Sequence, residues 1–107
     1  MSGERAPKGL GPAGRRLWRE MTREWELSED SLTLLRQACA SADTCDRLQE
    51  AAAAAEPVIQ GRLGQLLPNP VFTELRGERR LLLALLLALR EPVAEIADDY
   101  SGLRVAR

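Results

Sequence analysis

The sequence predicts a mainly α-helical protein with three principal helices that assembles into an oligomer. Leu and Ala supply most of the apolar content of the 107 residues and β-branched residues are few, which favours helix over sheet. Apolar residues recur at helical spacing in three segments, and Pro or Gly separates these segments. We therefore expect a helical hairpin, then a short β-hairpin or extended loop, then a last long helix.

The first predicted helix follows a flexible basic arm over residues 1–10, which are rich in Gly, Pro and charge. It begins at Pro12, because a first helical position needs no backbone N–H, and ends at about Trp25. Its expected buried stripe consists of residues at helical spacing: Leu17, Trp18, Met21 and Trp25.

The second predicted helix begins after Ser28 and continues to about Glu56. Ser28 is a favourable N-cap, and Glu29 and Asp30 lie where the helix dipole favours negative charge. Its apolar stripe is continuous and turns to alanine in its second half: Leu35, Ala38, Cys39, Ala42, Cys45, Leu48, Ala52 and Ala55.

The segment after Pro57 is apolar and contains two glycines, which predicts a β-hairpin or an extended loop over residues 58–66. The third helix opens at Asn69-Pro70 and ends near Arg90, because Pro92 disfavours helix in the residue before it. We expect residues 11–92 to form one helical domain, followed by a tail over residues 93–107 that is acidic and then basic.

A leucine run over residues 81–89 is apolar around the full circumference of the third helix. One face can pack on the first two helices: Val71, Phe72, Leu75, Leu82, Leu86 and Leu89. Leu83 and Leu87 then point elsewhere. Burial against another subunit is the interpretation we favour, with oligomerisation residues Leu82, Leu83, Leu86 and Leu87. The alternative is that the third helix is central in the monomer.

Several classes of function are excluded by composition. The chain has no histidine, which removes His metal ligands, His general bases and Ser-His or Cys-His pairs. The segment GRLG lacks the Lys-Ser/Thr of a phosphate-binding loop. We therefore expect no catalytic residue, metal, cofactor or small-molecule substrate. The leucine run is too short for a membrane span. Cys39 and Cys45 are expected to be buried reduced thiols of a cytosolic protein.

The order of these motifs resembles the phage terminase small subunit family. The matching segments are GLGPAGRRLWREM, LSEDSLTLLRQACASADTCDRLQEA and LPNPVFTELRGERRLLLALLLAL, with Pro92 close behind. The positions that carry the resemblance are Trp18, Asp30, Leu35, Cys39, Asn69, Pro70, Leu89 and Pro92. The family often has Leu-Gly-Leu before the final proline, where this chain has LALREP.

The resemblance implies a non-enzymatic protein of the host bacterial cytoplasm that forms a ring. Such a ring recognises double-stranded viral DNA and recruits or regulates a large terminase subunit, which carries the packaging ATPase and the nuclease. Many members also carry an N-terminal helix-turn-helix, but the turn at residues 25–28 lacks the Gly often seen in such turns.

Candidate phosphate contacts cluster near the start of the chain: Arg5, Lys8, Arg15, Arg16, Arg19 and Arg23. The alternative is a solvated helix face partnered by Glu20 and Glu24. A second basic cluster, Arg76, Arg79 and Arg80, is expected to pair with Glu74, Glu78 or acids of a neighbouring subunit.

The acidic stretch after the third helix is a candidate docking segment for the large subunit, by analogy with the family: Glu91, Glu95, Asp98 and Asp99. Two other classes of function stay open. One is a helical adaptor or assembly chaperone that binds one protein partner, and the other is a small dimeric DNA-binding regulator.

Overall fold

The computed structural model describes residues 5–90, in which three helices and one β-hairpin form an elongated body of 56 × 32 × 16 Å. The helices are α1 (Pro12–Glu24), α2 (Glu29–Ala53) and α3 (Pro70–Arg90), and the strands are β1 (Val58–Gln60) and β2 (Leu66–Pro68). The predicted helix starts are confirmed. Of the predicted ends, α1 stops one residue and α2 three residues early. The described residues end at Arg90, the last residue of α3, so the predicted end of the third helix stays a prediction.

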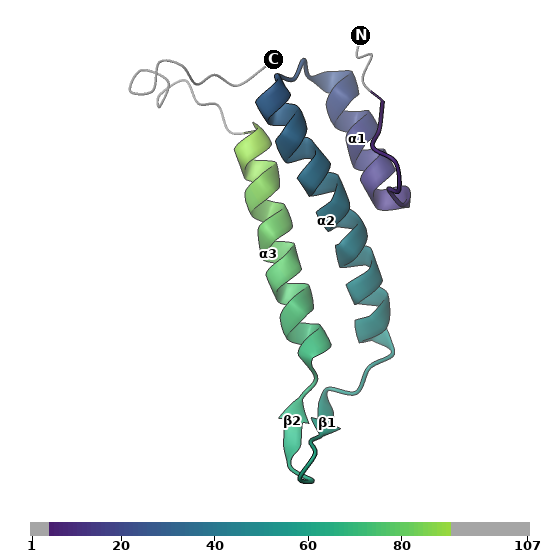
Figure 1. The fold of residues 1–107 in the computed structure, drawn as a ribbon, viewed down its shortest axis with the longest axis vertical. Coiled ribbons are helices and arrows are strands. Elements are labelled where there is room, and N and C mark those ends of the chain that lie inside the picture. Colours follow the sequence, from purple (N-terminus) through teal and green to yellow (C-terminus); the bar gives the residue numbers. More distant parts are fainter. Residues whose placement is uncertain (1–4, 91–107) are drawn as a thin grey trace, which may run out of the picture.

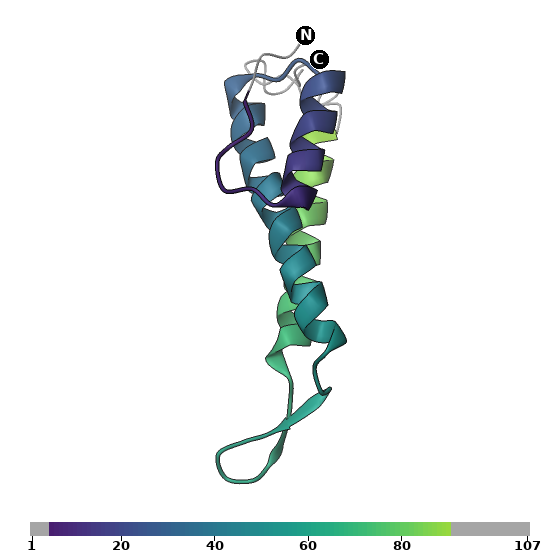
Figure 2. The same ribbon diagram turned by 90° about the vertical axis from the view of Figure 1, so that its right-hand side faces the viewer.

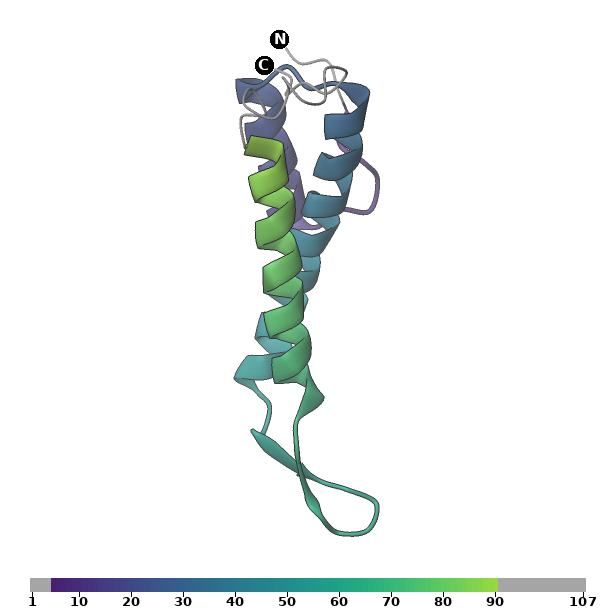
Figure 3. The same cartoon turned by 90° about the vertical axis from the view of Figure 1, so that its left-hand side faces the viewer.

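The three helices lie side by side in the order α1, α2, α3, so α2 is the middle helix (Figure 1). The helices α2 and α3 are antiparallel over their length, and α1 runs antiparallel to the N-terminal half of α2 (Figures 1 and 2). The prediction of a helical hairpin is therefore confirmed. The alternative in which the third helix is central is wrong, because α3 lies at the edge (Figure 3).

The core lies at the end of the molecule where all three helices are present. It consists of Trp18 and Met21 of α1, four residues of α2 and one of α3: Leu32, Leu35, Ala38, Cys39 and Leu89. Leu35 and Cys39 have no exposed surface. Full burial of a leucine contributes about 2–3 kcal/mol, so this short stretch supplies much of the hydrophobic stabilisation.

The other half of the α2–α3 pair is held by polar contacts as well as apolar ones. The Ser41 hydroxyl donates to Glu78 Oε2 at 2.7 Å, and Arg79 Nη2 donates to Gln49 Oε1 at 2.8 Å. Glu78 therefore bonds across the helix pair and not along its own helix. Both bonds join residues more than 25 positions apart in the sequence, so the sequence pattern did not reveal them.

The helix starts follow their capping residues. Ser28 Oγ accepts a hydrogen bond from the Ser31 backbone N–H at 3.2 Å, and Asn69 Oδ1 accepts one from the Val71 N–H at 3.1 Å. The Asn69 side chain also donates to the Glu56 carbonyl at 3.0 Å. Asn69 thus starts α3 and ties it to the chain that leaves α2.

The β-hairpin projects from the end of the body opposite α1 (Figure 1). Its strands are antiparallel, with Ile59 paired to Leu67 and Gln60 to Leu66. The turn closes through a bond of 2.7 Å from the Gly61 N–H to the Gln65 carbonyl, and Gly64 has φ +85°, a conformation that favours glycine. Of the two possibilities predicted for this segment, the structure has the hairpin.

Candidate nucleic-acid and subunit interfaces

Four arginines of α1 point away from the core. Arg15, Arg16, Arg19 and Arg23 are all exposed, because the opposite side of α1 carries Trp18 and Met21 into the core. Within residues 5–90 none of the four forms an ion pair with Glu20 or Glu24. Arg15 alone has a bonded partner there, since its Nη1 donates to the Leu10 carbonyl. The guanidinium groups are therefore accessible to a ligand.

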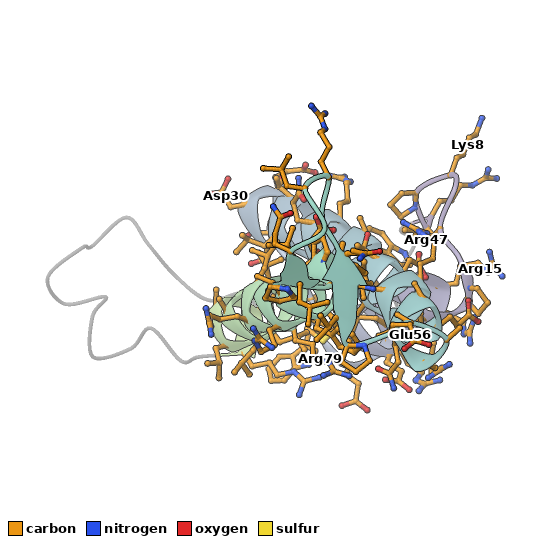
Figure 4. The ribbon with its side chains drawn as sticks, turned by 90° about the horizontal axis from the view of Figure 1, so that it is seen from below. Lys8, Arg15, Asp30, Arg47, Glu56 and Arg79 are labelled. Carbon is orange, nitrogen blue, oxygen red and sulfur yellow. The ribbon has the colours of Figure 1, made fainter. Side chains whose placement is uncertain are left out.

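The segment before α1 adds two further cations to this surface, because Arg5 and Lys8 are exposed. Lys8 and Arg15 project on the same side of the molecule, and so does Arg47 of α2 (Figure 4). Arg47 lies one helical turn after Asp43, the residue of α2 that contacts the start of α1. Sequence reasoning missed Arg47, because only the packing of α1 on α2 places it on the same side of the molecule as Lys8 (Figure 4).

The first turn of α1 is occupied by a carboxylate of the same chain. Asp43 of α2 is buried, and it accepts hydrogen bonds from the Gly11 N–H at 2.7 Å and the Gly14 N–H at 2.9 Å. A free helix N-terminus attracts phosphate through such N–H groups. Here the Asp43 carboxylate already accepts the N–H groups of Gly11 and Gly14 and adds negative charge. Any phosphate contact at the N-terminal end of α1 must therefore come from the cationic side chains.

The uncovered side of α3 carries leucines near its C-terminal end. Leu83 and Leu87 are 57% and 53% exposed, and Leu81, on another side of the helix, is 48% exposed. Leu82 and Leu86, also expected at an oligomer interface, are half-buried and pack against the core. Of the four leucines expected at an oligomer interface, only Leu83 and Leu87 are exposed within residues 5–90.

The same side of α3 becomes basic toward its N-terminal end, where Arg76, Arg79 and Arg80 are exposed. Pairing of these arginines with Glu74 or Glu78 of the same helix is not found within the described residues. Glu78 accepts from Ser41 instead, and Arg79 donates to Gln49. Arg76 and Arg80 thus have no bonded partner among residues 5–90.

The β-hairpin exposes a second apolar surface. Leu63 at its turn is 89% exposed, and Leu66 is 75% exposed. The remaining apolar side chains of the strands are also exposed: Val58, Ile59 and Leu67. An isolated two-stranded hairpin is only marginally stable in water, so this surface is suited to contact with another molecule.

The described residues were compared with what a metal site or a reactive thiol requires. Residues 5–90 contain no group of three potential metal ligands. Both cysteines are free and buried. Burial, with Asp43 nearby, raises the pKa of Cys39 to about 12, and burial also raises the pKa of Cys45. Both thiols therefore stay protonated and unreactive at neutral pH.

A shallow surface depression lies near the adjoining ends of α1 and α3. Its lining includes Glu20, Glu24, Trp25 and Arg90. No helix among residues 5–90 is both long and apolar enough to cross a membrane. The candidate docking acids Glu91, Glu95, Asp98 and Asp99 lie outside the described residues.

Comparison of the chain with family models, with curated proteins and with solved structures found no match.

Proposed function

We propose that this chain is a non-enzymatic subunit of a homo-oligomeric ring that binds double-stranded DNA, as the small terminase subunits of tailed phages do. In this role it recognises viral DNA and recruits or regulates a large ATPase-nuclease subunit in the bacterial cytoplasm. The observation that carries the proposal is the uncovered leucine face of α3, at the edge of an otherwise well-packed helical body.

Support for assembly comes from the position of α3. α3 packs on α2 along its length and meets α1 only near its last turn, where Arg90 Nη2 lies 3.9 Å from Met21 Sδ (Figure 1). Leu83 and Leu87, which lie on one side of the helix, are therefore more than half exposed within residues 5–90. Contiguous apolar patches of this kind mark contact sites in soluble proteins. The neighbour that we propose is a second copy of the chain.

Support for DNA binding comes from the cations around α1. Arg16, Arg19 and Arg23 are exposed and lack carboxylate partners within the described residues. Each phosphate that such a side chain neutralises releases a counterion, so binding would be strong at low salt and weak at high salt. In a ring, every subunit would contribute the same basic surface, so a modest number of cations per chain would add up to a large positive charge.

Support for the terminase assignment comes from the order of elements and from the roles of the residues that carry the resemblance. Trp18, Leu35 and Leu89 are core residues. Asn69 caps α3, and its bond to the Glu56 carbonyl closes the base of the hairpin. We propose that the acidic segment after α3 contacts the large subunit, with Glu91, Glu95, Asp98 and Asp99 as its charged residues.

Electron microscopy of the purified protein, with and without double-stranded DNA, tests the proposal directly. We expect rings of uniform subunit number and a DNA-dependent change in the images. Light scattering after gel filtration measures the mass of the same sample. A monomer at micromolar concentration would refute the assembly, and rings that bind no DNA at low salt would refute the nucleic-acid role.

A helical adaptor is the second candidate, and the exposed β-hairpin favours it. Its apolar side chains, Leu63 and Leu66 above all, could anchor one protein partner. Stoichiometry separates the two functions, because an adaptor would form a 1:1 complex and a terminase subunit a ring of many copies. No feature favours the dimeric regulator, since α1 and α2 lie side by side and not across each other as in a helix-turn-helix (Figure 1).

A further inference from the structure

The exposed side of α3 carries a narrow stripe with a basic part and an apolar part. The α3 stripe consists of four residues: Arg76, Arg80, Leu83 and Leu87. They are spaced by four, three and four positions, so they lie within about 60° of one another on a helix that turns about 100° per residue. All four side chains are exposed, and neither arginine has a bonded partner within residues 5–90. The stripe therefore suits a surface that is apolar at one end and acidic at the other.

The β-hairpin and the chain just before it form such a surface. Val58 and Leu66 lie on one face of the hairpin, because Leu66 pairs with Gln60, two positions from Val58. Both apolar side chains are exposed. Glu56 lies at the hairpin base, where its backbone carbonyl accepts a hydrogen bond from the Asn69 side chain. The Glu56 carboxylate is exposed and has no bonded partner among the described residues.

The apolar parts of the two surfaces have matching spacings. Val58 and Leu66 are about 7 Å apart along the strands, at about 3.3 Å per residue. Leu83 and Leu87 are about 6 Å apart along α3, at about 1.5 Å per residue. The two hairpin side chains can therefore each meet one leucine of the α3 stripe.

The charged parts come together in the same register. With Val58 placed at Leu83, Glu56 lies about 7 Å further toward the hairpin base. On α3, Arg80 and Arg76 lie about 5 Å and about 11 Å before Leu83. The acid therefore falls between the two guanidinium groups.

A chain cannot place its own hairpin on its own stripe. Leu87 lies about 26 Å from Pro70 along α3, and the hairpin projects away from the helices beyond Pro70 (Figure 1). The occupant must come from another molecule, and a second copy offers a hairpin of the right composition and spacing. Contact between two different surfaces of identical chains builds a ring when the rotation closes.

We propose that the β-hairpin of each copy lies on the α3 stripe of the next copy, head to tail. Leu66 contacts Leu87 of that copy, and Glu56 lies beside its Arg80. The contact rests on the proposed function, because it is the contact that closes the proposed ring. Each chain gives one hairpin and receives one, so the stripe and the hairpin are both covered.

Disulfide trapping in the full-length chain tests the contact. Leu66→Cys is combined with Leu87→Cys, and the oxidised protein is separated on a denaturing, non-reducing gel. We expect a ladder of linked chains that ends at the subunit number measured by light scattering. A bridge within one chain is excluded, because a disulfide needs Cα atoms within about 7 Å of each other. The native thiols, Cys39 and Cys45, are buried and do not compete.

Three variants are the controls for the ladder. Leu66→Cys alone and Leu87→Cys alone place a single new thiol in each contact, so both should run as single chains. Leu66→Cys with Leu81→Cys has two new thiols at exposed positions, but Leu81 lies on another side of α3. This matched pair should give no ladder.

Charge exchange tests the register. In the variant with thiols at positions 66 and 87, Glu56→Arg should slow ladder formation about threefold, as expected for an exposed ion pair. Adding Arg76→Glu with Arg80→Glu should restore the rate. Glu20→Arg changes an exposed acid of α1 and should leave the rate unchanged.

The possible failures are distinguishable. Rings that give no ladder, or rates that charge exchange does not restore, would overturn the hairpin contact and leave the proposed ring standing. Linked dimers from either single variant would show that like surfaces meet, and a two-thiol product that stops at the dimer would show a reciprocal pair. Either result overturns the head-to-tail contact. A parent protein that is monomeric in light scattering would refute the ring itself, and the contact with it.

Discussion

Asp43 and Gly14 form a contact that fixes α1 on α2. The Asp43 carboxylate accepts the Gly14 N–H at 2.9 Å, and a Cβ at position 14 would lie 2.5 Å from Asp43 Oδ2 and 2.7 Å from the Cys39 carbonyl. The helices can approach this closely only because residue 14 has no side chain. In return, the carboxylate caps a helix whose own N-cap residue is Gly11, which has no side chain to do so.

Replacing Asp43 should destabilise the protein. Asp43→Ala removes two hydrogen bonds to a charged acceptor and leaves the N–H groups of Gly11 and Gly14 without a partner. We expect a loss of about 2–3 kcal/mol in the free energy of unfolding. Urea denaturation measures this loss. Asp46→Ala, one turn away and exposed, is the control and should change stability by less than about 0.5 kcal/mol.

Two glycine-to-alanine substitutions should have opposite effects. Gly14→Ala forces α1 away from Asp43 and the Cys39 carbonyl, and we expect a loss of about 1–3 kcal/mol. Gly77, inside α3, has no heavy atom within 4 Å of an added Cβ. Gly77→Ala should therefore gain about 0.5–1 kcal/mol from helix propensity. Thermal unfolding of both variants at one concentration gives the comparison, and a stabilised Gly14→Ala would contradict the close contact.

The thiol of Cys39 should react only when the protein unfolds. Its pKa is raised to about 12 by burial and by Asp43, so the folded state holds the proton more tightly than the unfolded chain. The stability that this difference contributes is complete below the ordinary thiol pKa of about 8.5 and is lost as the pH rises toward 12. We expect slow labelling by a thiol reagent at pH 8, and Cys39→Ala should reduce the loss of stability at alkaline pH. Rapid labelling of the folded protein at pH 8 would contradict the burial.

Substitutions at two adjacent leucines of α3 should distinguish an effect on folding from an effect on assembly. Leu86 is half-buried against the core, so Leu86→Ala should cost about 2 kcal/mol of stability. Leu87 is 53% exposed, and Leu87→Ala should leave the unfolding of the monomer nearly unchanged. Leu87→Glu should instead reduce the oligomer mass measured by light scattering. A Leu87→Glu variant with the parent mass would exclude this face from the interface.

The arginines of α1 should account for much of the salt dependence of DNA affinity. Arg16→Glu with Arg19→Glu should weaken binding of double-stranded DNA and reduce the slope of log affinity against log salt by about 0.9 for each phosphate that is no longer neutralised. Arg62→Glu at the hairpin turn changes charge at an equally exposed site and is the control. Fluorescence anisotropy at several salt concentrations measures both slopes. Equal effects at the two sites would exclude α1 as the DNA surface.

The sequence by itself determined the elements, because their signals are local. Ser28 and Asn69 cap the helices that follow them, and Pro57 and Pro70 bracket the hairpin segment. Spacing of apolar residues also identified Trp18, Met21, Leu35 and Cys39 as core. Each of these assignments depends on residues within a few positions of one another in the sequence. The sequence alone is therefore enough to make them.

Only the tertiary structure decided which surfaces remain free. The spacing places Leu82 and Leu86 on the packing face of α3, but it leaves all four leucines, with Leu83 and Leu87, as candidates for an oligomer interface. Only the structure shows that the first pair is half-buried and the second pair is exposed. That distinction follows from α2 being the middle helix. The cap of α1 by Asp43 spans 32 residues, and the bond between Ser41 and Glu78 spans 37. Such partners are fixed by how helices pack in space, which local spacing does not encode.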